Sequence, residues 1–241
     1  MEAGRAILEV YNSEDFNVEL KGDNSPLTLA DKASHHVIVN ALTATGLPVF
    51  SEEGKSIPFE ERRQWEYFWL VDPLDGTKEF IKRNGEFTVN IALIHKNSAV
   101  GGVVYVPVNG NLYWAAKGDG AFLKSRNEPP IRMNIDKDKP VHAIVASRSH
   151  MSPETAEFIE QYPGANIISM GSSLKFLLVA EGKAQLYPRF APTMEWDTAA
   201  AQAIVEEAGG VVLNYPSLQP VSYNRENLLN GWFLVSYKAL T

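Results

Sequence analysis

Two aspartates stand close together in residues 72–77, which read DPLDGT. Pro73 lies between Asp72 and Asp75, and proline restricts both its own backbone and that of its neighbour. Two carboxylates held this close repel each other, by about 4 kcal/mol at 4 Å for an effective dielectric constant of 20. A cation between them, or protonation of one of them, relieves that repulsion. Hard oxygen ligands in a chain without cysteine indicate Mg²⁺ or Mn²⁺.

The next residues add the other parts of a phosphate site. Gly76 and Thr77 begin a predicted short helix, residues 78–82, and N–H groups at a helix start can bind phosphate. The Thr77 hydroxyl could orient a water molecule. A cation site, a phosphate seat and a water holder in one short stretch indicate a phosphatase. The alternative is that Asp72 and Asp75 are only turn and N-cap residues, where aspartate is common.

Two more acidic positions are candidates for the same cluster. Glu52 lies in a charged stretch, where the alternative is an exposed loop. Asp197 precedes a helix predicted over residues 198–208, where it could be only an N-cap. Trp196 and the small residues after Asp197 indicate close packing around that carboxylate.

Composition limits the class of protein. The chain has 241 residues, a net charge of −7 and a pI near 5.3, which argues against a nucleic-acid-binding surface. The absence of cysteine excludes disulfides and cysteine-ligated zinc or iron–sulfur sites. No apolar run reaches the ~18 residues that span a bilayer, and the N-terminus lacks the apolar stretch of a secretory signal. We expect a cytoplasmic protein without an integral membrane segment.

The predicted elements place these residues. A buried strand at residues 67–71 delivers Asp72 at its carboxyl end, and β segments cover residues 87–116 with a hairpin at Asn109-Gly110. Strands and helices alternate from residue 143 onward, which favours a layered α/β (α+β) sandwich. Residues 1–241 form one domain, and a polar link over 124–140 separates sub-domains 1–124 and 140–241. The predicted helices cover residues 2–11, 29–43 (capped by Thr28 and Asp31), 172–181 and 198–208, and one more begins at Pro153.

These motifs resemble the two signatures of the inositol monophosphatase superfamily, whose members are lithium-sensitive, magnesium-dependent phosphatases. The signatures here are residues 72–77 and the pair Trp196-Asp197. Inositol monophosphatases usually carry TNF where residues 78–80 read KEF, so the stretch 69–83 is similar to the bacterial 3′(2′),5′-bisphosphate nucleotidase branch. The likeness covers nearly the whole chain and includes DNSPLTLAD at 23–31, SRSH at 147–150, GSSLKF at 171–176 and LYPRF at 186–190.

The resemblance implies an αβαβα sandwich and a reaction. The reaction is hydrolysis of 3′-phosphoadenosine 5′-phosphate to AMP and phosphate by metal-activated water, the disposal step of sulfate assimilation. Two or three Mg²⁺ ions, or Mn²⁺, would be bound by Glu52, Asp72, the Leu74 carbonyl, Asp75 and Asp197. Asp31 and Thr77 would hold and activate the water, with Glu52 assisting. The implied contacts with the nucleotide are Ser147, His150, Ser172, Lys175 and Arg189.

The sequence leaves several alternatives open. The same machinery could act on inositol monophosphate or a sugar phosphate, and a non-catalytic metal- or nucleotide-binding protein is the alternative from another class. Without the resemblance, Lys175 would be an exposed helix lysine and Arg189 a surface guanidinium. The sequence does not decide between a monomer and a homodimer. It also leaves open the lithium affinity and any association with the cytoplasmic face of the inner membrane.

Overall fold

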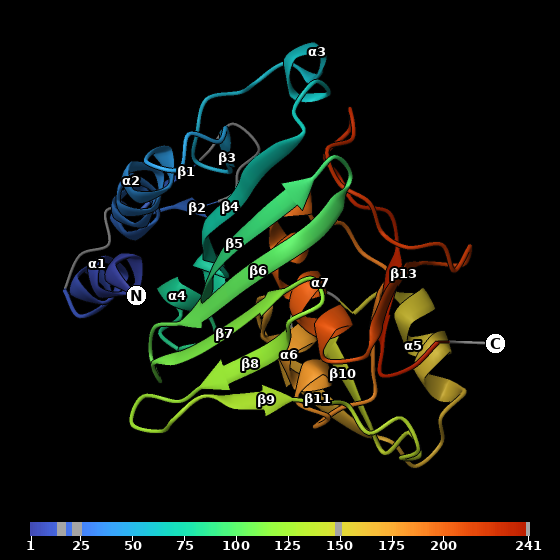
Figure 1. The fold of residues 1–241 in the computed structure, drawn as a ribbon. Coiled ribbons are helices and arrows are strands. Elements are labelled where there is room, and N and C mark those ends of the chain that lie inside the picture. Colours follow the sequence, from blue (N-terminus) through green and yellow to red (C-terminus); the bar gives the residue numbers. More distant parts are fainter. Residues whose placement is uncertain (14–17, 21–25, 148–150, 240–241) are drawn as a thin grey trace.

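Helices and two β-sheets alternate in five layers in the computed structural model of this chain (Figure 1). The structure describes residues 1–13, 18–20, 26–147 and 151–239. The order of the layers is helices, a seven-stranded sheet, helices, a five-stranded sheet and a last helix. This order confirms the expected αβαβα sandwich. Among the described residues, no helix combines the length and the apolar character that crossing a bilayer demands.

The first layer consists of α1 (Glu2–Tyr11) and α2 (Leu29–Thr43), at the bounds predicted from the sequence. Thr28 caps α2 in a capping box with Asp31, which confirms the predicted N-terminus. Apolar side chains of both helices, including Ile7 and Ile38, pack on the sheet beneath them. A short pair, β1 (Glu19–Leu20) and β2 (Pro26–Leu27), lies in a region where the sequence predicts no strand.

The seven-stranded sheet follows chain order from β3 to β9. Only β3 and β4 are parallel, and the other neighbours are antiparallel. Gly110, with φ of 76°, is the last residue of the turn that joins β6 to β7, where the sequence predicts a hairpin. The strands are β3 (Val49–Ser51), β4 (Tyr67–Asp75), β5 (Thr88–His95), β6 (Ser98–Val106), β7 (Asn111–Ala116), β8 (Gly120–Lys124) and β9 (Ile131–Met133), and the short helix α3 (Phe59–Arg62) precedes β4.

The predicted link over residues 124–140 is not only a linker. It contains β9, which pairs with β8 and completes the seven-stranded sheet. The sequence does not predict this strand because it is short and lacks a buried face: Ile131 and Arg132 are exposed, and Met133 alone of the three residues is buried. The division of the chain into two sub-domains at this link stays a prediction.

The middle layer is α6 (Leu174–Ala180) with α7 (Glu195–Glu207), and it contacts both sheets. The helix α7 crosses the inner face of the large sheet so closely that a Cβ on Gly102 would lie 2.1 Å from the carbonyl oxygen of Ala200. Small residues on both elements make this approach possible. This close approach fixes α7, the helix that carries Asp197, against β6.

The second sheet has the order β11-β10-β12-β14-β13. Its first three strands are parallel, and β14 is antiparallel to both of its neighbours. The outermost helix, α5 (Pro153–Glu160), starts at Ser152, whose hydroxyl accepts a hydrogen bond from the Thr155 N–H. The strands are β10 (Ala143–Ser147), β11 (Asn166–Met170), β12 (Leu186–Arg189), β13 (Val211–Asn214) and β14 (Phe233–Ser236).

Candidate active site

The strand β4 ends in an irregular turn that carries both aspartates. The pairing of β4 with β5 shifts register between Asp72 and Asp75, so the chain bulges there. Asp72 is buried, and its Oδ1 accepts a hydrogen bond of 3.0 Å from the Leu74 N–H. The Pro73 carbonyl accepts one of 2.7 Å from the Ser34 hydroxyl of α2. These two bonds fix the turn that presents Asp75.

The short helix α4 (Thr77–Ile81) starts immediately after this turn. Its N-cap is Gly76, at a φ of 95°, where a Cβ would lie 2.9 Å from the Glu86 carbonyl oxygen. Only glycine fits this left-handed position without strain. Thr77 is thus the first residue of a helix, as the sequence predicts, and its N–H has no acceptor within the helix.

The Thr77 hydroxyl points at a carboxylate from another layer. It donates to Asp31 Oδ1 at 3.1 Å, and the Leu74 carbonyl oxygen lies at a longer 3.3 Å. The other oxygen of Asp31 accepts from the N–H and the hydroxyl of Thr28, at 2.7 and 2.6 Å. Burial raises the pKa of Asp31, and the Thr28 hydrogen bonds oppose that rise. Asp31 is therefore a buried carboxylate aimed at the motif helix.

The helix that carries Asp197 begins earlier than its sequence predicts. It starts at Glu195 and not at Thr198, so Asp197 is the third residue of α7 and is not its N-cap. Asp197 Oδ2 accepts a hydrogen bond of 2.8 Å from the Met194 N–H. The expected N-terminus was wrong because Met194, which occupies the N-cap, is not a residue type that marks helix starts.

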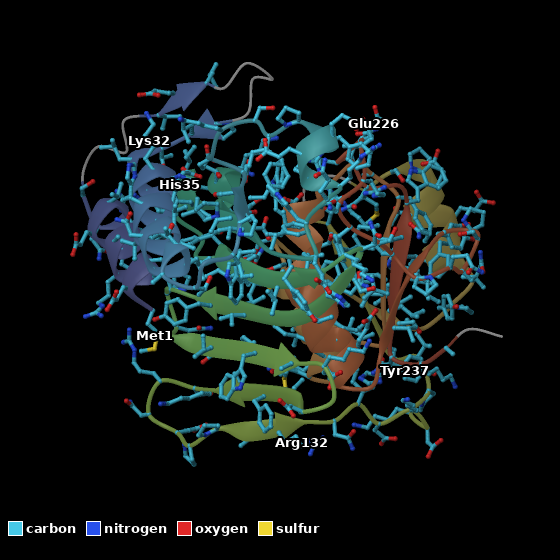
Figure 2. The ribbon with its side chains drawn as sticks, turned by 45° about the horizontal axis from the view of Figure 1, so that its top comes forward. Met1, Lys32, His35, Arg132, Glu226 and Tyr237 are labelled. Atoms are coloured by element: carbon cyan, nitrogen blue, oxygen red, sulfur yellow. The ribbon has the colours of Figure 1, made fainter. Side chains whose placement is uncertain are left out.

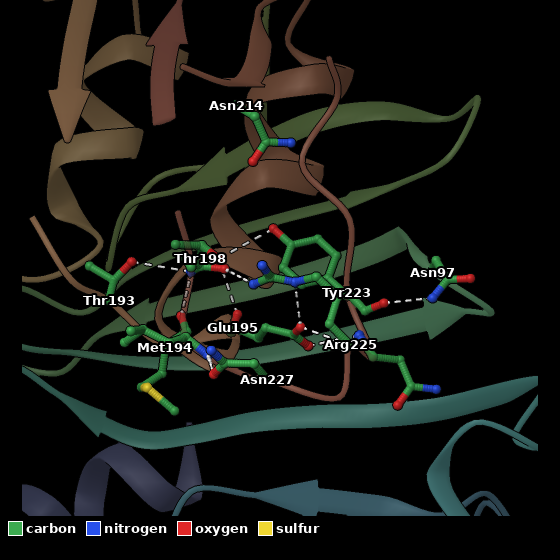
Figure 3. A network of polar contacts seen from close by, with 12 residues as sticks. Asn97, Thr193, Met194, Glu195, Thr198, Asn214, Tyr223, Arg225 and Asn227 are labelled. Carbon is green, nitrogen blue, oxygen red and sulfur yellow. Dashed lines mark hydrogen bonds and ion pairs between the residues drawn. The ribbon is translucent and has the colours of Figure 1, made fainter. Parts of the chain in front are cut away.

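A buried network holds the first turn of α7 (Figure 3). Glu195 is only 1% exposed and accepts from the N–H groups of Asn224 and Arg225, at 2.7 and 3.1 Å, and from Arg225 Nε at 2.9 Å. Asn230 donates to the Met194 carbonyl at 2.8 Å, directly before this turn. The network therefore fixes the backbone from which Asp197 projects.

The same network reaches the segment that follows Glu52. Asn224 accepts from the guanidinium of buried Arg62 at 2.9 Å and donates to the Arg62 carbonyl at 2.8 Å. Directly before Glu52, at the end of β3, Ser51 Oγ lies 2.9 Å from Nδ1 of His35, which is labelled on α2 in Figure 2. Both ends of the stretch between β3 and β4 are therefore fixed to other layers.

Three of the four candidate carboxylates come together. Asp72, Asp75 and Asp197 each place one oxygen within 4.8 Å of the others. Glu52 contributes to the same pocket wall, and its charge is among the groups that raise the pKa of Asp72. Burial is the first cause of the raised pKa of both Asp72 and Asp197, and the neighbouring carboxylates add to it.

This donor set fits a hard divalent cation. All of its atoms are carboxylate oxygens, the ligand type that Mg²⁺ and Mn²⁺ prefer. A cation among them would remove both the mutual repulsion and the cost of burying negative charge. The carbonyl of Leu74 belongs to the same turn and is a further oxygen donor. The residues present therefore suit the ions that the sequence implies.

A pocket of about 300 Å³ opens beside the cluster. Four of the five expected nucleotide contacts line it, whereas His150 lies outside the described residues. The site residues in its wall are Glu52, Asp75, Gly76, Thr77, Ser147, Ser172, Lys175, Arg189 and Asp197. These residues come from both sheets and from the helices between them, so the pocket lies where the layers meet.

Two cationic side chains face this pocket. Lys175 is only 7% exposed, against the expectation of an exposed lysine, and it donates to the Ser172 carbonyl at 2.5 Å. Burial lowers the pKa of Lys175 to about 8. Arg189 donates through Nη2 to the Pro192 carbonyl at 3.0 Å, while its buried Nε has no partner in the described part of the chain. The pocket thus combines a carboxylate cluster with positive charge.

The inositol monophosphatase family matches residues 1–231. The chain belongs to this family. The match extends over nearly the whole chain, so the assignment does not rest on one motif.

Two relatives and one solved structure illustrate how close the family members are. The 3′(2′),5′-bisphosphate nucleotidase CysQ of Escherichia coli K12 is 49% identical over 97% of this chain and 95% of its own length. The protein of the same name from Salmonella typhimurium is 48% identical with the same coverage. The crystal structure of CysQ from Bacteroides thetaiotaomicron has a TM-score of 0.87 and 48% identity, and it covers 97% of this chain and 92% of that one. The present chain, as a member of the same inositol monophosphatase family, is therefore a phosphatase.

Three residues that were not predicted from the sequence contact the Asp75 carboxylate. Thr88 and Asn90 of β5 are buried beside Asp75, and Ser173, directly before α6, donates its N–H to the same carboxylate. A signal for the first two was present, because polar residues two apart on a buried strand point to the same face. No local pattern marks Ser173, which lies 98 positions from Asp75.

Proposed function

We propose that this chain hydrolyses 3′-phosphoadenosine 5′-phosphate to AMP and phosphate with bound Mg²⁺. The observation that carries the proposal is that one pocket holds both the carboxylate cluster and two cationic side chains, Lys175 and Arg189. A ligand with two phosphates needs both kinds of group, one for the scissile phosphate and one for the second phosphate. The names of the close relatives support the same substrate.

The cations would be bound by the carboxylates of Asp72, Asp75, Asp197 and Glu52 and by the Leu74 carbonyl. Two or three Mg²⁺ ions are expected, with Mn²⁺ as a substitute. When bound, such ions polarise phosphoryl oxygens and make water more acidic. The protein's part is to hold these oxygens in one cluster before the ions arrive, which the turn at Pro73 and the first turn of α7 do.

Thr77 and Asp31 would position the attacking water. Because the Thr77 hydroxyl donates its hydrogen to Asp31, its oxygen lone pairs remain to accept a hydrogen bond from water. The water is then fixed at the start of α4, beside the phosphate. As its oxygen attacks phosphorus, a proton can pass through the Thr77 hydroxyl to Asp31 Oδ1, with Glu52 assisting. The bond between phosphorus and the ribose 3′ oxygen breaks on the opposite side, and that oxygen takes a proton from solvent to become the 3′ hydroxyl of AMP.

The remaining contacts would bind the substrate. The N–H groups of Gly76 and Thr77 at the helix start suit the scissile phosphate. Lys175 and Arg189 suit the second phosphate, and Ser147 and Ser172 lie in the same wall. The contact expected from His150 stays a prediction. This reaction belongs to the disposal step of sulfate assimilation, and we expect it in the cytoplasm from a monomer or a homodimer.

A direct test is to incubate the purified protein with 3′-phosphoadenosine 5′-phosphate and Mg²⁺ and to identify both products. The proposal predicts AMP and inorganic phosphate in equal amounts, and no release in excess EDTA. If the nucleotide product were adenosine 3′-phosphate, the 5′ phosphate would have been removed instead of the 3′ phosphate, and the proposal would be wrong. Release that persists at full rate in EDTA would contradict the role given to the cations.

A further inference from the structure

Asp75 is held through one of its two oxygens by residues from two different segments. The Ser173 N–H donates to Asp75 Oδ2 at 2.5 Å, and the Asn90 side-chain amide donates to the same oxygen at 3.4 Å. Among the described residues, no hydrogen bond reaches Oδ1. Oδ2 is therefore engaged by the protein, and Asp75 also has one oxygen within 4.8 Å of oxygens of Asp72 and Asp197.

A chain of buried hydroxyls determines which end of the Asn90 amide faces Asp75. The Ser173 hydroxyl donates to Asn90 Oδ1 at 2.9 Å, and the Thr88 hydroxyl lies 2.8 Å from the Ser173 hydroxyl oxygen and 3.2 Å from Asn90 Oδ1. With its carbonyl oxygen engaged by Ser173, Asn90 turns its NH₂ group toward Asp75. Thr88, Asn90 and Ser173 are all at most 2% exposed, so water does not compete for these bonds.

The turn that carries Ser173 also forms the substrate side of the pocket. Ser172 has a φ of 46°, and its carbonyl accepts from Lys175. The N–H of Gly171 donates to Glu86 Oε2 at 2.7 Å. A Cβ on Gly171 would lie 2.9 Å from Glu79 Cγ, so the turn is tightly packed against the motif helix and the loop after it. Movement of this turn would therefore also move Ser172 and Ser173.

We propose that Thr88, Asn90 and Ser173 form a clasp that positions Asp75 for the cation and couples cation binding to substrate binding. This inference rests on the proposed function. A cation bound by Asp75 would fix its carboxylate, and the clasp would then fix the 171–173 turn, to which Ser172 belongs and to which Lys175 is hydrogen-bonded. A phosphorylated ligand bound to that turn stabilises the same arrangement. Because coupling is reciprocal, each ligand should tighten the binding of the other.

The clasp can be tested by direct Mn²⁺ binding, followed through the electron paramagnetic resonance signal of the free ion and without turnover. Ser173→Ala removes the hydroxyl and keeps the N–H donor, and Asn90→Leu removes the amide at nearly constant size. Supporting partners of metal ligands are typically worth about 10- to 100-fold in metal affinity, so we expect the Mn²⁺ Kd to rise roughly 10-fold in each variant. Ser236→Ala is the matched control and should leave the Kd unchanged, because Ser236 is buried and its hydroxyl bonds the Lys238 carbonyl and N–H, away from Asp75.

The coupling is measured by repeating the Mn²⁺ titration with adenosine 5′-phosphate present, after correction for the ion bound by the free nucleotide. Wild-type protein should bind Mn²⁺ several-fold more tightly with the nucleotide, and Ser173→Ala should lose most of that factor. A folded Ser173→Ala protein with wild-type Kd and wild-type coupling would overturn the clasp, even if Asn90→Leu fails to fold. Wild-type protein that shows the coupling but releases no phosphate from 3′-phosphoadenosine 5′-phosphate would refute the proposed function and leave the clasp standing.

Discussion

The Thr77 hydroxyl lies 3.1 Å from Asp31 Oδ1, although the two residues are 46 positions apart in the chain. One begins the short helix after the double-aspartate turn, and the other belongs to the first turn of α2. The contact joins the outer helix layer to the edge of the carboxylate cluster. In the proposed mechanism this contact would give a water molecule at the start of α4 both a hydrogen-bond acceptor and a route for its proton.

Thr77→Ala should lower kcat strongly and leave KM nearly unchanged. The variant keeps the backbone N–H that faces the phosphate and loses only the hydroxyl that orients the water. A contact that acts mainly in the transition state appears in kcat, and we expect a loss of about 10²-fold or more. Steady-state kinetics with Thr77→Ser as the control should show most of the rate restored. A rise in KM at constant kcat would mean that Thr77 only binds substrate.

Mg²⁺ should stabilise the folded protein, because ions that bind the native state alone shift the unfolding equilibrium. At 100 times its Kd, a ligand adds about 2.7 kcal/mol to the free energy of unfolding. Thermal unfolding with EDTA and with Mg²⁺ plus phosphate should show this difference in the wild type and lose it in Asp197→Asn. Glu206→Gln, which changes a carboxyl at the other end of the same helix, should keep the full Mg²⁺ effect. An unchanged melting temperature in saturating Mg²⁺ would argue against a preformed cation site.

Lys175 should make substrate binding sensitive to pH. Burial lowers its pKa to about 8, so the side chain is charged below that value and loses its proton as the pH rises through it. The KM for a doubly phosphorylated nucleotide is therefore expected to rise above pH 8. Lys175→Arg keeps a positive charge at every pH tested and should flatten the profile. The same rise in both proteins would place the titrating group elsewhere.

Arg62→Met should destabilise the fold much more than the same change at the next residue. Arg62 is 3% exposed, donates to the Ile57 carbonyl and to Asn224 Oδ1, and lies over the Phe50 ring. Its loss leaves buried acceptors unpaired, and we expect a cost of about 3 kcal/mol in urea unfolding.

Arg63 provides the matched control for this change. It is exposed and pairs only with exposed Glu60, three residues earlier. Surface pairs of this kind contribute little, so Arg63→Met should change the free energy of unfolding by less than about 1 kcal/mol. Equal effects at the two positions would contradict the role given to the network in fixing the first turn of α7.

The local half of the site could be predicted from the sequence because its parts are adjacent in the chain. Asp72, Asp75, Gly76 and Thr77 follow one buried strand, and the bulge and the left-handed Gly76 agree with the predicted rigid turn. The fold class was accessible for a related reason, since strand and helix periodicities recur along the chain. The capping box of Thr28 is a comparable local signal.

The remaining parts depend on contacts between distant segments, which a single sequence does not show. Burial of Lys175 depends on the layers that close over it, whereas lysine is normally exposed. Glu195 accepts hydrogen bonds from Asn224 and Arg225, which lie about thirty positions later in the chain. Arg62 donates a hydrogen bond to Asn224, which lies 162 positions later. The start of α7 was misplaced because Met194 caps it without a polar side chain. The strand β9 was missed because most of it faces solvent.

The ratio of kcat/KM for two substrates tests the central claim most directly. Phosphate release from 3′-phosphoadenosine 5′-phosphate and from inositol 1-phosphate should be measured side by side at equal Mg²⁺. Because Lys175 and Arg189 can meet a second phosphate that the inositol compound lacks, we expect the nucleotide to be preferred by about 10²-fold or more. Equal values, or a preference for inositol 1-phosphate, would contradict the account and assign the pocket to a monophosphate.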